Sequence, residues 1–591
     1  MVQRMTNPLL RFLTGLLICI FSFIYAQDTS QKPLQKDPYF TPKTVPQKNA
    51  PPPEKVKHIH SDELRKDPNK YDGNNYFTGN VQFEHQGSLL NADLVIVYEG
   101  QNFVKAIGNV KLQNADGSVI TANEMEYDGN TQRGIARKNV VLTDPKGTVI
   151  KTETMYYDRV SNQAYYNTGG TINDGKSTTY SKTATYFLAT RTIDLSGRVK
   201  IEDAQYVLEG DNVVQNQNTN IVNINGPTTI INKQNPKNRI VTDKGNYNTN
   251  TKEAFLYKNS RVYYNDKILT GDEMYYNQLT GFGKATGNVT IDDPNERRWI
   301  KGGYGEIFEK KDSAMMTKNP YAVKALEKDS MYFAAEKIIS FQKPDSANIN
   351  AKKSFLRAFR KGRFYKSNAQ GRADSIAFNE TDGVLHMYTE PILWSNGKQV
   401  TGDKIEAYFN TEKENIDSLK VIGNAFAISK VDSLNMKDEF NQVKGKLMTV
   451  YYGEDNNIKE AKVIGNAQAI TYSDDVNAQT KQKERIGISL STCGIIDAIF
   501  EEKALYVVEC NIGANSDTYP MSLIEPAKRK FPDFNWNTKD RILKWQDILV
   551  DTPNYPEIKY ETDTALYDSA QKVIEDEKAK EEAKKPKRTR R

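Results

Sequence analysis

From about residue 75 to residue 470 the chain alternates apolar and polar residues one at a time. In Asn80-Val81-Gln82-Phe83-Glu84 every second side chain is apolar, and Glu124-Met125-Glu126-Tyr127 has the same pattern. A period of two residues is typical of β-strands that bury one face. Turn-forming runs such as Asp128-Gly129-Asn130 separate these segments. The pattern therefore predicts strand–turn–strand units and no helix over this stretch.

Two short markers recur along the same stretch. The second marker joins a small residue to an acidic one or Asn, as in Ala92-Asp93, and lies about 13–14 residues after the first. Twelve starts of the second marker between residues 92 and 445, mostly about 30 residues apart, predict a repeat architecture. The first marker begins an alternating segment with Gly-Asn or a variant of it, at Gly79-Asn80-Val81, Gly108-Asn109-Val110, Lys138-Asn139-Val140, Gly197-Arg198-Val199, Gly287-Asn288-Val289, Gly423-Asn424-Ala425 and Gly465-Asn466-Ala467.

The acidic residues of the second marker recur too regularly for a catalytic pair, which would occur once in the chain. We expect them to act where strands begin. They are Asp93, Glu153, Asp272, Asp374 and Asp403.

The alternation assigns a set of apolar side chains to one shared inward face. These side chains form either a continuous trough that can hold a ligand or an ordinary sandwich core that closes on itself, and composition does not separate the two. The inward set comprises Val81, Phe83, Val95, Val97, Val110, Leu112, Met125, Tyr127, Val140, Leu142, Met155, Tyr157, Met274, Tyr276, Val289 and Ile291.

The composition fits strands that bury only one face. Of the 591 residues 38% are hydrophobic, while aromatic residues make up 10%, which argues against wholesale disorder. The formal net charge is +6, of which residues 1–26 carry +2 and residues 571–591 carry +4, so the segment between them is neutral. A neutral body argues against broad nucleic-acid binding, which needs a basic face.

The two ends of the chain differ from the alternating body. Residues 1–26 predict a secretory signal peptide, with Arg4 and Arg11 before an apolar run and Ala26 at the cleavage position. Residues 27–57 form a proline-rich linker, residues 516–570 are expected to cap the repeats, and residues 571–591 form a charged, disordered tail. We therefore expect an exported, periplasmic protein.

Two cysteines, Cys493 and Cys510, follow the predicted signal peptide. The midpoint between them falls at Glu501-Glu502, so a hairpin that turns there would set the two cysteines opposite each other, near disulfide reach. An oxidising compartment favours the bond. Two buried free thiols are the alternative, and the sequence leaves both open.

Residues 343–372 form a basic insertion with nine Lys and Arg residues, one Asp and interleaved aromatic residues. The plainer interpretation is a solvated loop and strand pair, since charge runs usually lie on the surface. The alternative is a contact for phosphorylated or anionic lipid head groups. The candidate residues for such a contact are Lys352, Lys353, Arg357, Arg360 and Arg363.

Two motifs suggest chemistry that their context does not support. Residues 170–177 match the Walker A spacing, but a phosphate loop opens a helix, and the residues that follow here are β-formers. His58-Ile59-His60 and His85 are weak metal candidates in a chain with four histidines and no cysteine nearby. We assign no nucleotide, cofactor, metal ion or catalytic residue to the chain.

The run from Thr78 to Asp93 contains Gly79-Asn80-Val81, Gln86-Gly87 and Ala92-Asp93 in that order, and it resembles the organic solvent tolerance (OstA-like) family. The family includes the periplasmic lipopolysaccharide transport protein LptA and the N-terminal domain of LptD. The later repeats extend the likeness over roughly residues 58–470. The resemblance implies an all-β fold, an extended antiparallel β-jellyroll that is open along one side. We divide it into a first part, residues 58–340, and a second part, residues 341–515.

The resemblance also implies a function and partners. The jellyroll interior would hold the acyl chains of lipopolysaccharide, and the protein would stack end to end with other jellyroll transport proteins, toward an outer-membrane translocon. Because each buried CH₂ is worth about 0.8 kcal/mol, shielding an acyl chain of about 12 carbons removes a barrier on the order of 10 kcal/mol. The alternatives are a structural or adhesive β-repeat protein at the cell surface and a carbohydrate-active β-solenoid enzyme, which would need a localised cleft of acidic and aromatic residues.

Overall fold

The computed structural model describes residues 54–549, apart from residues 258, 349, 432–437, 455 and 502–503. The predicted signal peptide, most of the predicted linker and the predicted tail lie outside the described residues. The described part is nearly all β-structure, and antiparallel pairing joins its forty strands into one hydrogen-bonded network. The predicted all-β, antiparallel jellyroll is confirmed.

Sixteen of these strands have ten or more residues, and their pairings shift register near the middle. These long strands are β3 (Asn75–His85), β4 (Ser88–Tyr98), β5 (Phe103–Gln113), β6 (Val119–Asp128), β7 (Arg133–Thr143), β8 (Val149–Asp158), β13 (Thr192–Glu202), β14 (Tyr206–Asn216), β23 (Phe282–Asp293), β24 (Arg298–Phe308), β29 (Lys352–Lys366), β30 (Ala369–Asn379), β35 (Ile416–Lys430), β36 (Phe440–Tyr452), β37 (Ile458–Val476) and β38 (Lys483–Glu501).

The other strands have eight residues or fewer and follow one another in pairs, each pair resembling a long strand that is interrupted at its middle. They are β1 (Lys57–His60), β2 (Glu63–Lys66), β9 (Gln163–Tyr166), β10 (Gly170–Asn173), β11 (Thr178–Ser181), β12 (Thr183–Phe187), β15 (Ile221–Ile224), β16 (Thr228–Asn232), β17 (Arg239–Thr242), β18 (Gly245–Asn248), β19 (Glu253–Leu256), β20 (Arg261–Tyr264), β21 (Lys267–Thr270), β22 (Glu273–Asn277), β25 (Ser313–Thr317), β26 (Tyr321–Ala325), β27 (Ser330–Ala334), β28 (Lys337–Pro344), β31 (Val384–Tyr388), β32 (Ile392–Ser395), β33 (Lys398–Thr401), β34 (Lys404–Phe409), β39 (Ala504–Asn511) and β40 (Asn515–Pro520). Short 3₁₀ helices are η3 (Tyr71–Gly73), η4 (Glu99–Gln101), η5 (Glu309–Lys311), η6 (Pro526–Arg529) and η7 (Trp545–Leu549).

A sharp corner divides each long strand into two arms. In β3 the corner is made by two successive residues with positive φ, Gly79 at +74° and Asn80 at +45°. Glycine and asparagine adopt this backbone region more readily than other residues, which explains the Gly-Asn marker of the sequence. The arms of β13 pair with different strands, because β12 covers residues 192–196 and β11 covers residues 200–202. The arms therefore build two layers that meet along the corners.

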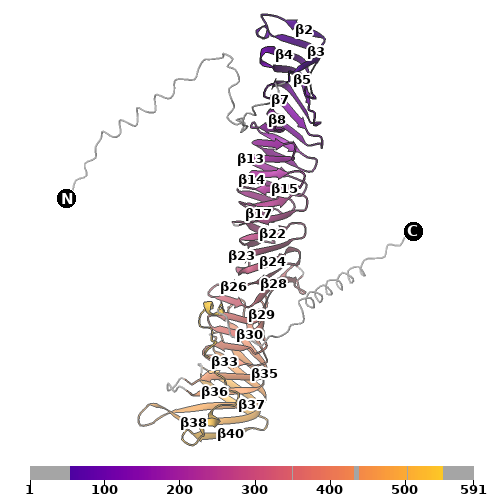
Figure 1. Cartoon of the computed structure of the whole chain (residues 1–591). Helices are drawn as coiled ribbons and strands as arrows, with labels where there is room; N and C mark the ends of the chain where they lie inside the picture. The colour runs from indigo at the N-terminus through magenta and orange to yellow at the C-terminus, as the bar shows by residue number, and fades with distance from the viewer. Residues whose placement is uncertain are drawn as a thin grey trace, which may run out of the picture. The chain divides into compact units, whose positions relative to one another are not determined.

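Hairpin turns join the strands alternately at the two outer edges of these layers. Figure 1 shows the strands following one another in chain order from β2 to β40. We name the turns of one edge A turns, which include residues 86–87, 114–118, 144–148, 174–177, 203–205, 233–238, 265–266, 294–297, 326–329, 367–368 and 396–397. We name the turns of the other edge B turns, which include residues 99–102, 129–132, 159–162, 188–191, 217–220, 249–252, 278–281, 309–312, 380–383 and 410–415.

The apolar core lies between the two layers. One cluster of buried side chains extends from Phe77 to Ile496 and has members on both sides of residue 340, such as Ile338 and Leu356. Alternation places the next residue of each strand on the outside, as with buried Leu112 between exposed Lys111 and Gln113. The domain boundaries at residues 340 and 515 stay predictions.

After β40 the chain runs back across strands of the jellyroll. In this segment, residues 521–549, Phe531 and Trp536 pack on an outward cluster that contains Phe426 and Phe440, and Trp545 stacks on Tyr332 with ring centroids 5.1 Å apart. The buried amide of Gln442 accepts from the Phe531 backbone N–H at 3.0 Å and donates to the Arg529 carbonyl at 3.0 Å. These residues thus lie along the outer face of several strands, while the wider cap predicted for residues 516–570 stays a prediction.

Candidate functional site

The structure brings the sixteen inward residues together in one place. Fourteen of them are buried members of the core cluster, and the other two, Val97 and Tyr127, are half-buried and pack against it. Their side chains come from strands far apart in the sequence, as with Val81 and Ile291, which are 210 positions apart. The alternating pattern alone was sufficient to find them, and their role in lipid binding stays a proposal.

The core between the layers is filled by its own side chains. A cavity of about 20 Å³ lies among Phe83, Leu90 and Met125, and another of about 30 Å³ lies beside Tyr264 and Ile291. Each has room for roughly one or two water molecules and not for an acyl chain. The structure therefore shows the core closed, so a lipid would have to separate the two layers to enter it.

Side-chain contacts close the edge opposite the corners. A turns reach B turns there, and we call this row of contacts the polar seam. Asn265 Nδ2 donates to the Glu309 carbonyl at 2.9 Å, and the Glu327 backbone N–H donates to Glu414. Thr148 Oγ1 donates to Gln217 Oε1 at 3.2 Å. The corner edge is continuous backbone, whereas the seam is held by side chains, so the seam is the edge at which the layers can separate.

Buried ion pairs strengthen the seam. Arg191 Nη1 lies 3.1 Å from Asp144 Oδ2, and the two side chains are 13% and 3% exposed. Burial by itself would raise the pKa of Asp144, but the Tyr186 hydroxyl at 2.6 Å, the Thr148 backbone N–H at 2.8 Å and the Arg191 charge hold that pKa below its ordinary value. The carboxylate is therefore ionised at neutral pH and paired with Arg191.

The N-terminal end of the seam carries a different set of groups. His85 is buried, with Nδ1 2.8 Å from the Tyr127 hydroxyl and Nε2 2.9 Å from the Glu54 carbonyl oxygen. Burial raises the pKa of Tyr127 to about 12, so its hydroxyl keeps its proton at neutral pH. The Arg159 guanidinium lies next to these groups and donates to Gln132 Oε1 at 3.0 Å.

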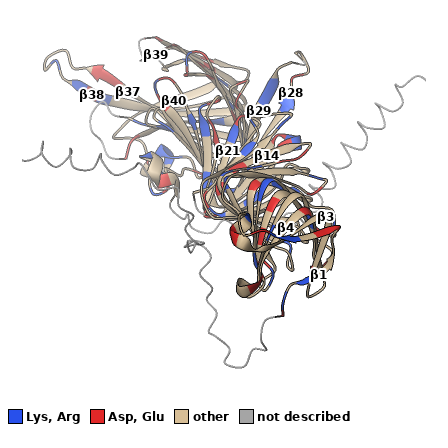
Figure 2. Cartoon of the chain, turned by 90° about the horizontal axis from the view of Figure 1, so that it is seen from above, with Lys and Arg blue, Asp and Glu red and all other residues tan. Residues whose placement is uncertain are grey.

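The basic insertion lies on β28, β29 and the start of β30, where Figure 2 shows Lys and Arg on neighbouring ribbons. Most of its candidate head-group residues are engaged by protein groups. Lys353 pairs with Asp382 at 2.8 Å, Lys361 with Glu336 at 2.9 Å, and Lys352 with Asp312. Arg360 lies 3.9 Å from Glu336, and Arg363 donates to the Ile548 carbonyl at 2.8 Å. These partners would compete with a lipid head group, and a head-group role for this insertion stays a prediction.

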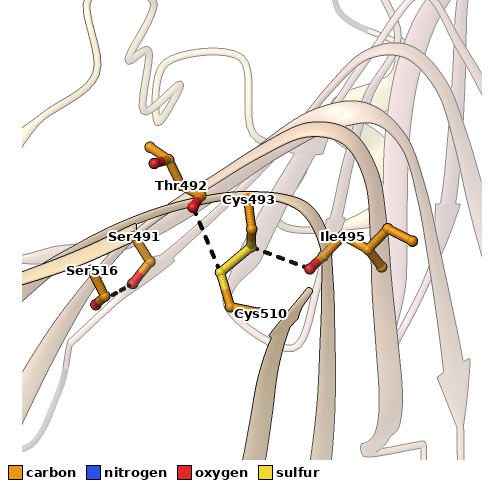
Figure 3. The surroundings of a disulfide bond; sticks show 6 residues. All are labelled: Ser491, Thr492, Cys493, Ile495, Cys510 and Ser516. Atoms are coloured by element: carbon orange, nitrogen blue, oxygen red, sulfur yellow. Dashed lines mark hydrogen bonds between the residues drawn. A yellow bond between two sulfur atoms is a disulfide. The ribbon is translucent and has the colours of Figure 1, made fainter. Parts of the chain in front are cut away.

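Cys493 and Cys510 are joined by a disulfide, with Cα atoms 5.8 Å apart (Figure 3). The two residues are not directly opposed, however, because the register places Ile496 opposite Cys510. A register shift between Ile499 and Phe500 moves the hairpin away from the predicted symmetry. The bond lies where β38 changes partner from β39 to β40, at Thr492 and Ile495. The bond thus ties the last strands together diagonally.

The other motifs have structural roles. Residues 170–173 and 178–181 form the antiparallel strands β10 and β11, so the Walker A match is a hairpin turn as expected. Asp93, Asp272 and Asp403 each accept a hydrogen bond from the Asn of the Gly-Asn corner that follows them. His58 lies against Phe77, and among residues 54–549 no group of three His, Cys, Asp or Glu side chains is arranged to hold a metal ion.

Sequence reasoning missed the seam. Its residues are ordinary polar residues of turns, and their partners lie 40 to 90 positions away in the sequence. One signal in the sequence could have indicated the seam. Asp144 and Asp203 each stand directly after an alternating strand, and an aspartate that is largely buried at such a turn needs a cation from elsewhere in the chain.

Two segments of the chain match known protein families. Residues 53–211 match the OstA-like protein family, and residues 285–413 match the family described as LptA/(LptD N-terminal domain) LPS transport protein. Over residues 53–211 the chain is therefore similar to OstA-like proteins, and over residues 285–413 it is similar to the LptA and LptD N-terminal domains. A search of the curated proteins gives no match.

The OstA-like segments cover both layers, the corners and much of the seam. Together with the antiparallel jellyroll, they identify a β-jellyroll of the lipopolysaccharide-transport type. The matched families are transport domains rather than enzymes, and they belong to the cell envelope. Within the described part of the chain, no helix has the length and apolar character needed to cross a membrane.

Proposed function

We propose that this OstA-like protein carries lipopolysaccharide through the periplasm with the acyl chains between its two layers. The observation that carries the proposal is one apolar core, continuous from Phe77 to Ile496, that is closed on one edge by backbone corners and on the other by side chains alone. An acyl chain that enters such a core stays out of water. Keeping each CH₂ group out of water is worth about 0.8 kcal/mol.

The closed core implies that loading is coupled to opening of the polar seam. The apolar side chains now touching one another would line the lipid, and the hydrogen bonds of the seam would be exchanged for bonds to water. Transport of this kind uses no nucleophile or cofactor, because the protein only lowers the cost of exposing the lipid.

The ends of the array suit end-to-end contact with other jellyroll transport proteins. The edge strand β39 carries exposed apolar residues, with Leu505 48%, Tyr506 66% and Val508 50% exposed. At the other end, the short strands β1 and β2 pair with β3 and are exposed along their whole length. Unpaired strand edges can add a strand from a partner, which would extend the apolar core from one protein to the next.

The test is photo-crosslinking in cells that make the full chain. A photoreactive residue at Phe83 or Met125 faces the core, whereas one at Lys111 or Lys151 faces solvent on the same layers. We expect crosslinks to lipopolysaccharide from the two core positions and not from the two outer positions. Equal labelling from both sets, or no labelling from the core, would overturn the proposal.

A further inference from the structure

The cations buried in the polar seam have carboxylate partners, with one exception. In four contacts between A and B edges both side chains are at most 19% exposed, and a carboxylate meets a cation. Pairing of this kind is needed because an isolated charge is costly to take out of water. The four pairs are Asp144 with Arg191, Asp203 with Lys252, Asp312 with Lys267, and Glu380 with Arg298.

Arg159 is the exception. Its guanidinium donates to neutral oxygens, namely the Gln86 carbonyl at 2.6 Å, Gln132 Oε1 at 3.0 Å and Gln86 Oε1. No carboxylate forms an ion pair with Arg159 in the part of the chain that the structure describes. Gln86 is the first residue after β3, the same place that Asp144 holds after β7 and Asp203 after β13. An amide thus stands at the position where two of the four seam pairs, those of Arg191 and Lys252, have a carboxylate.

The carboxylates of the neighbourhood interact with other groups. Asp158 pairs with Arg133 at 3.0 Å, and Glu54 pairs with Lys57 at 2.5 Å. Asp116 accepts from the Ser118 hydroxyl at 2.6 Å. Glu84, which also lines the cavity beside Arg159, accepts from the Gly87 backbone N–H at 2.7 Å. Arg159 therefore has no carboxylate in direct contact, and Glu54 acts on it only from a distance.

An apolar cavity lies directly beside this charge. The cavity has Arg159 in its wall together with apolar Phe83, Leu112 and Met125, and the half-buried Val56 also lines it. Two polar atoms of residues lining this cavity, Ser88 Oγ and Asn114 Oδ1, are buried without a hydrogen-bond partner. Unsatisfied buried polar atoms are uncommon in folded proteins and call for a ligand or a bound water.

We propose that the Arg159 end of the seam is a head-group site for a phosphorylated lipid, with the phosphate on the guanidinium and the start of an acyl chain in the space that opens at the cavity when the layers separate. The proposal rests on the function proposed above and names the part of the molecule that selects the lipid. A guanidinium binds a phosphate through two parallel hydrogen bonds, which is stronger than its present bonds to neutral amides. Val56 lines the cavity, and its backbone N–H donates one hydrogen bond of 3.3 Å to Asn102 Oδ1, so entry of the chain would displace Val56 at the cost of that bond.

The site is tested by lipid binding to the purified full chain without its leader. The probes are lipid A with its phosphates, lipid A with the phosphates removed, and inorganic phosphate. Arg159→Gln removes the charge, and Gln86→Asp supplies the carboxylate that the Arg191 and Lys252 pairs have at this position. The matched control is Arg137→Gln, since Arg137 is 36% exposed and is paired with Glu126 on the outer face.

We expect both Arg159→Gln and Gln86→Asp to weaken binding of phosphorylated lipid A at least about tenfold. Binding of the dephosphorylated lipid stays unchanged, and Arg137→Gln binds both lipids as the original chain does. Because Gln86→Asp forms a new buried pair, its melting temperature does not fall, which separates loss of binding from loss of folding.

The outcomes distinguish this site from the wider function. If the original chain binds neither lipid, the proposed function itself fails. If it binds both lipids and the Arg159 and Gln86 variants bind phosphorylated lipid A unchanged, lipid carriage stands and the Arg159 site is overturned. Binding of inorganic phosphate as tightly as phosphorylated lipid A would overturn the assignment to a lipid head group.

Discussion

Asn109 Nδ2 donates a hydrogen bond of 2.9 Å to Asp93 Oδ2, and this contact connects the two sequence markers. Asn109 stands in the corner of β5 with a positive φ, and Asp93 stands in β4 on the neighbouring strand. The same contact joins Asn288 to Asp272 at 2.8 Å and Asn424 to Asp403 at 3.0 Å. Three of the five recurring carboxylates therefore hold corners at which strands pass from one layer to the other. The expectation that all five act where strands begin is wrong, because Asp93, Glu153 and Asp374 lie inside β4, β8 and β30.

The corner should be sensitive to a single methyl group. At Gly108 the φ is +80°, and an added Cβ would lie 2.5 Å from Asp93 Oδ2. We expect Gly108→Ala to destabilise the corner by about 1–3 kcal/mol, from backbone strain and from loss of the Asn109 contact. Amide hydrogen exchange in β4 and β5 measures the loss. Gly100→Ala is the control, because a Cβ there meets nothing within 4 Å; equal effects of the two changes would contradict this account.

The seam should weaken in acid. Burial opposes ionisation of Asp144, Asp203 and Asp312, but their cations and hydrogen bonds lower each pKa below its ordinary value. An unfolded Asp titrates at about 3.9. Since the folded values are lower, the stabilisation is fully present above about pH 5 and is lost as the pH falls through the folded values. Urea midpoints measured from pH 7 down to about pH 2.5 should therefore stay level and then drop.

Removing one partner of a seam pair should cost more than removing a surface partner. Asp144→Asn leaves Arg191 buried without a carboxylate, and we expect a loss of about 3–5 kcal/mol at pH 7. Asp266→Asn breaks an exposed pair with Lys237 and should cost less than about 1 kcal/mol. Hydrogen exchange near each site measures both losses. Similar losses at the two sites would show that the seam pair does not hold the layers together.

Bridging the seam should prevent loading of lipid nearby. Thr148 and Gln217 lie on opposite edges with their side-chain oxygens 3.2 Å apart. In a Thr148→Cys/Gln217→Cys variant joined by a short bis-maleimide, a photoreactive residue at Leu142 should lose most of its lipid crosslinks. Each single-cysteine variant treated with the reagent serves as the control. Unchanged crosslinking in the bridged protein would show that lipid enters by another route.

The disulfide should stabilise the last strands and leave the rest of the array unchanged. Its two cysteines are 17 residues apart, and a loop of that size gives about 3 kcal/mol of stabilisation. In the Cys493→Ser/Cys510→Ser variant we expect faster hydrogen exchange in β39 and β40, with β5 to β8 as the internal control. Equal changes in both regions, or no change in β39, would contradict the prediction.

Some features of the fold could be predicted from the sequence because they depend only on neighbouring residues. The period of two residues placed Phe83 and Met125 on one face, and the Gly-Asn pairs recur in the sequence because few other residues adopt two successive positive φ values. The β-forming residues after the Walker A match predicted a strand there, and the structure has β11 at Thr178–Ser181. None of these features depends on a distant part of the chain.

The cysteine pair shows where local reasoning reached its limit. Counting from the midpoint predicted a hairpin with Cys493 opposite Cys510. The pairing is centred one residue later, between Glu501 and Ala504, and a register shift between Ile499 and Phe500 adds one more position, so Ile496 lies opposite Cys510. The cysteine spacing indicates neither this register nor the change of partner from β39 to β40 between Ile495 and Thr492.

By itself, the sequence determined the strands, the inward set and the resemblance to the OstA-like family, since each is read from neighbouring residues. The tertiary structure decided that the Gly-Asn pairs form corners inside long strands, whereas the sequence had placed them at the starts of strands. Only the tertiary structure decided that the core is closed and that a polar seam closes it. Arg298 meets Glu380 82 positions away, and Arg363 meets the Ile548 carbonyl 185 positions away. The first pair forms because stacking of successive hairpins brings the two turn edges together, and the second forms because residues 521–549 run back across the outer face of the strands. The missing ion pair of Arg159 is likewise visible only once its neighbours are in place.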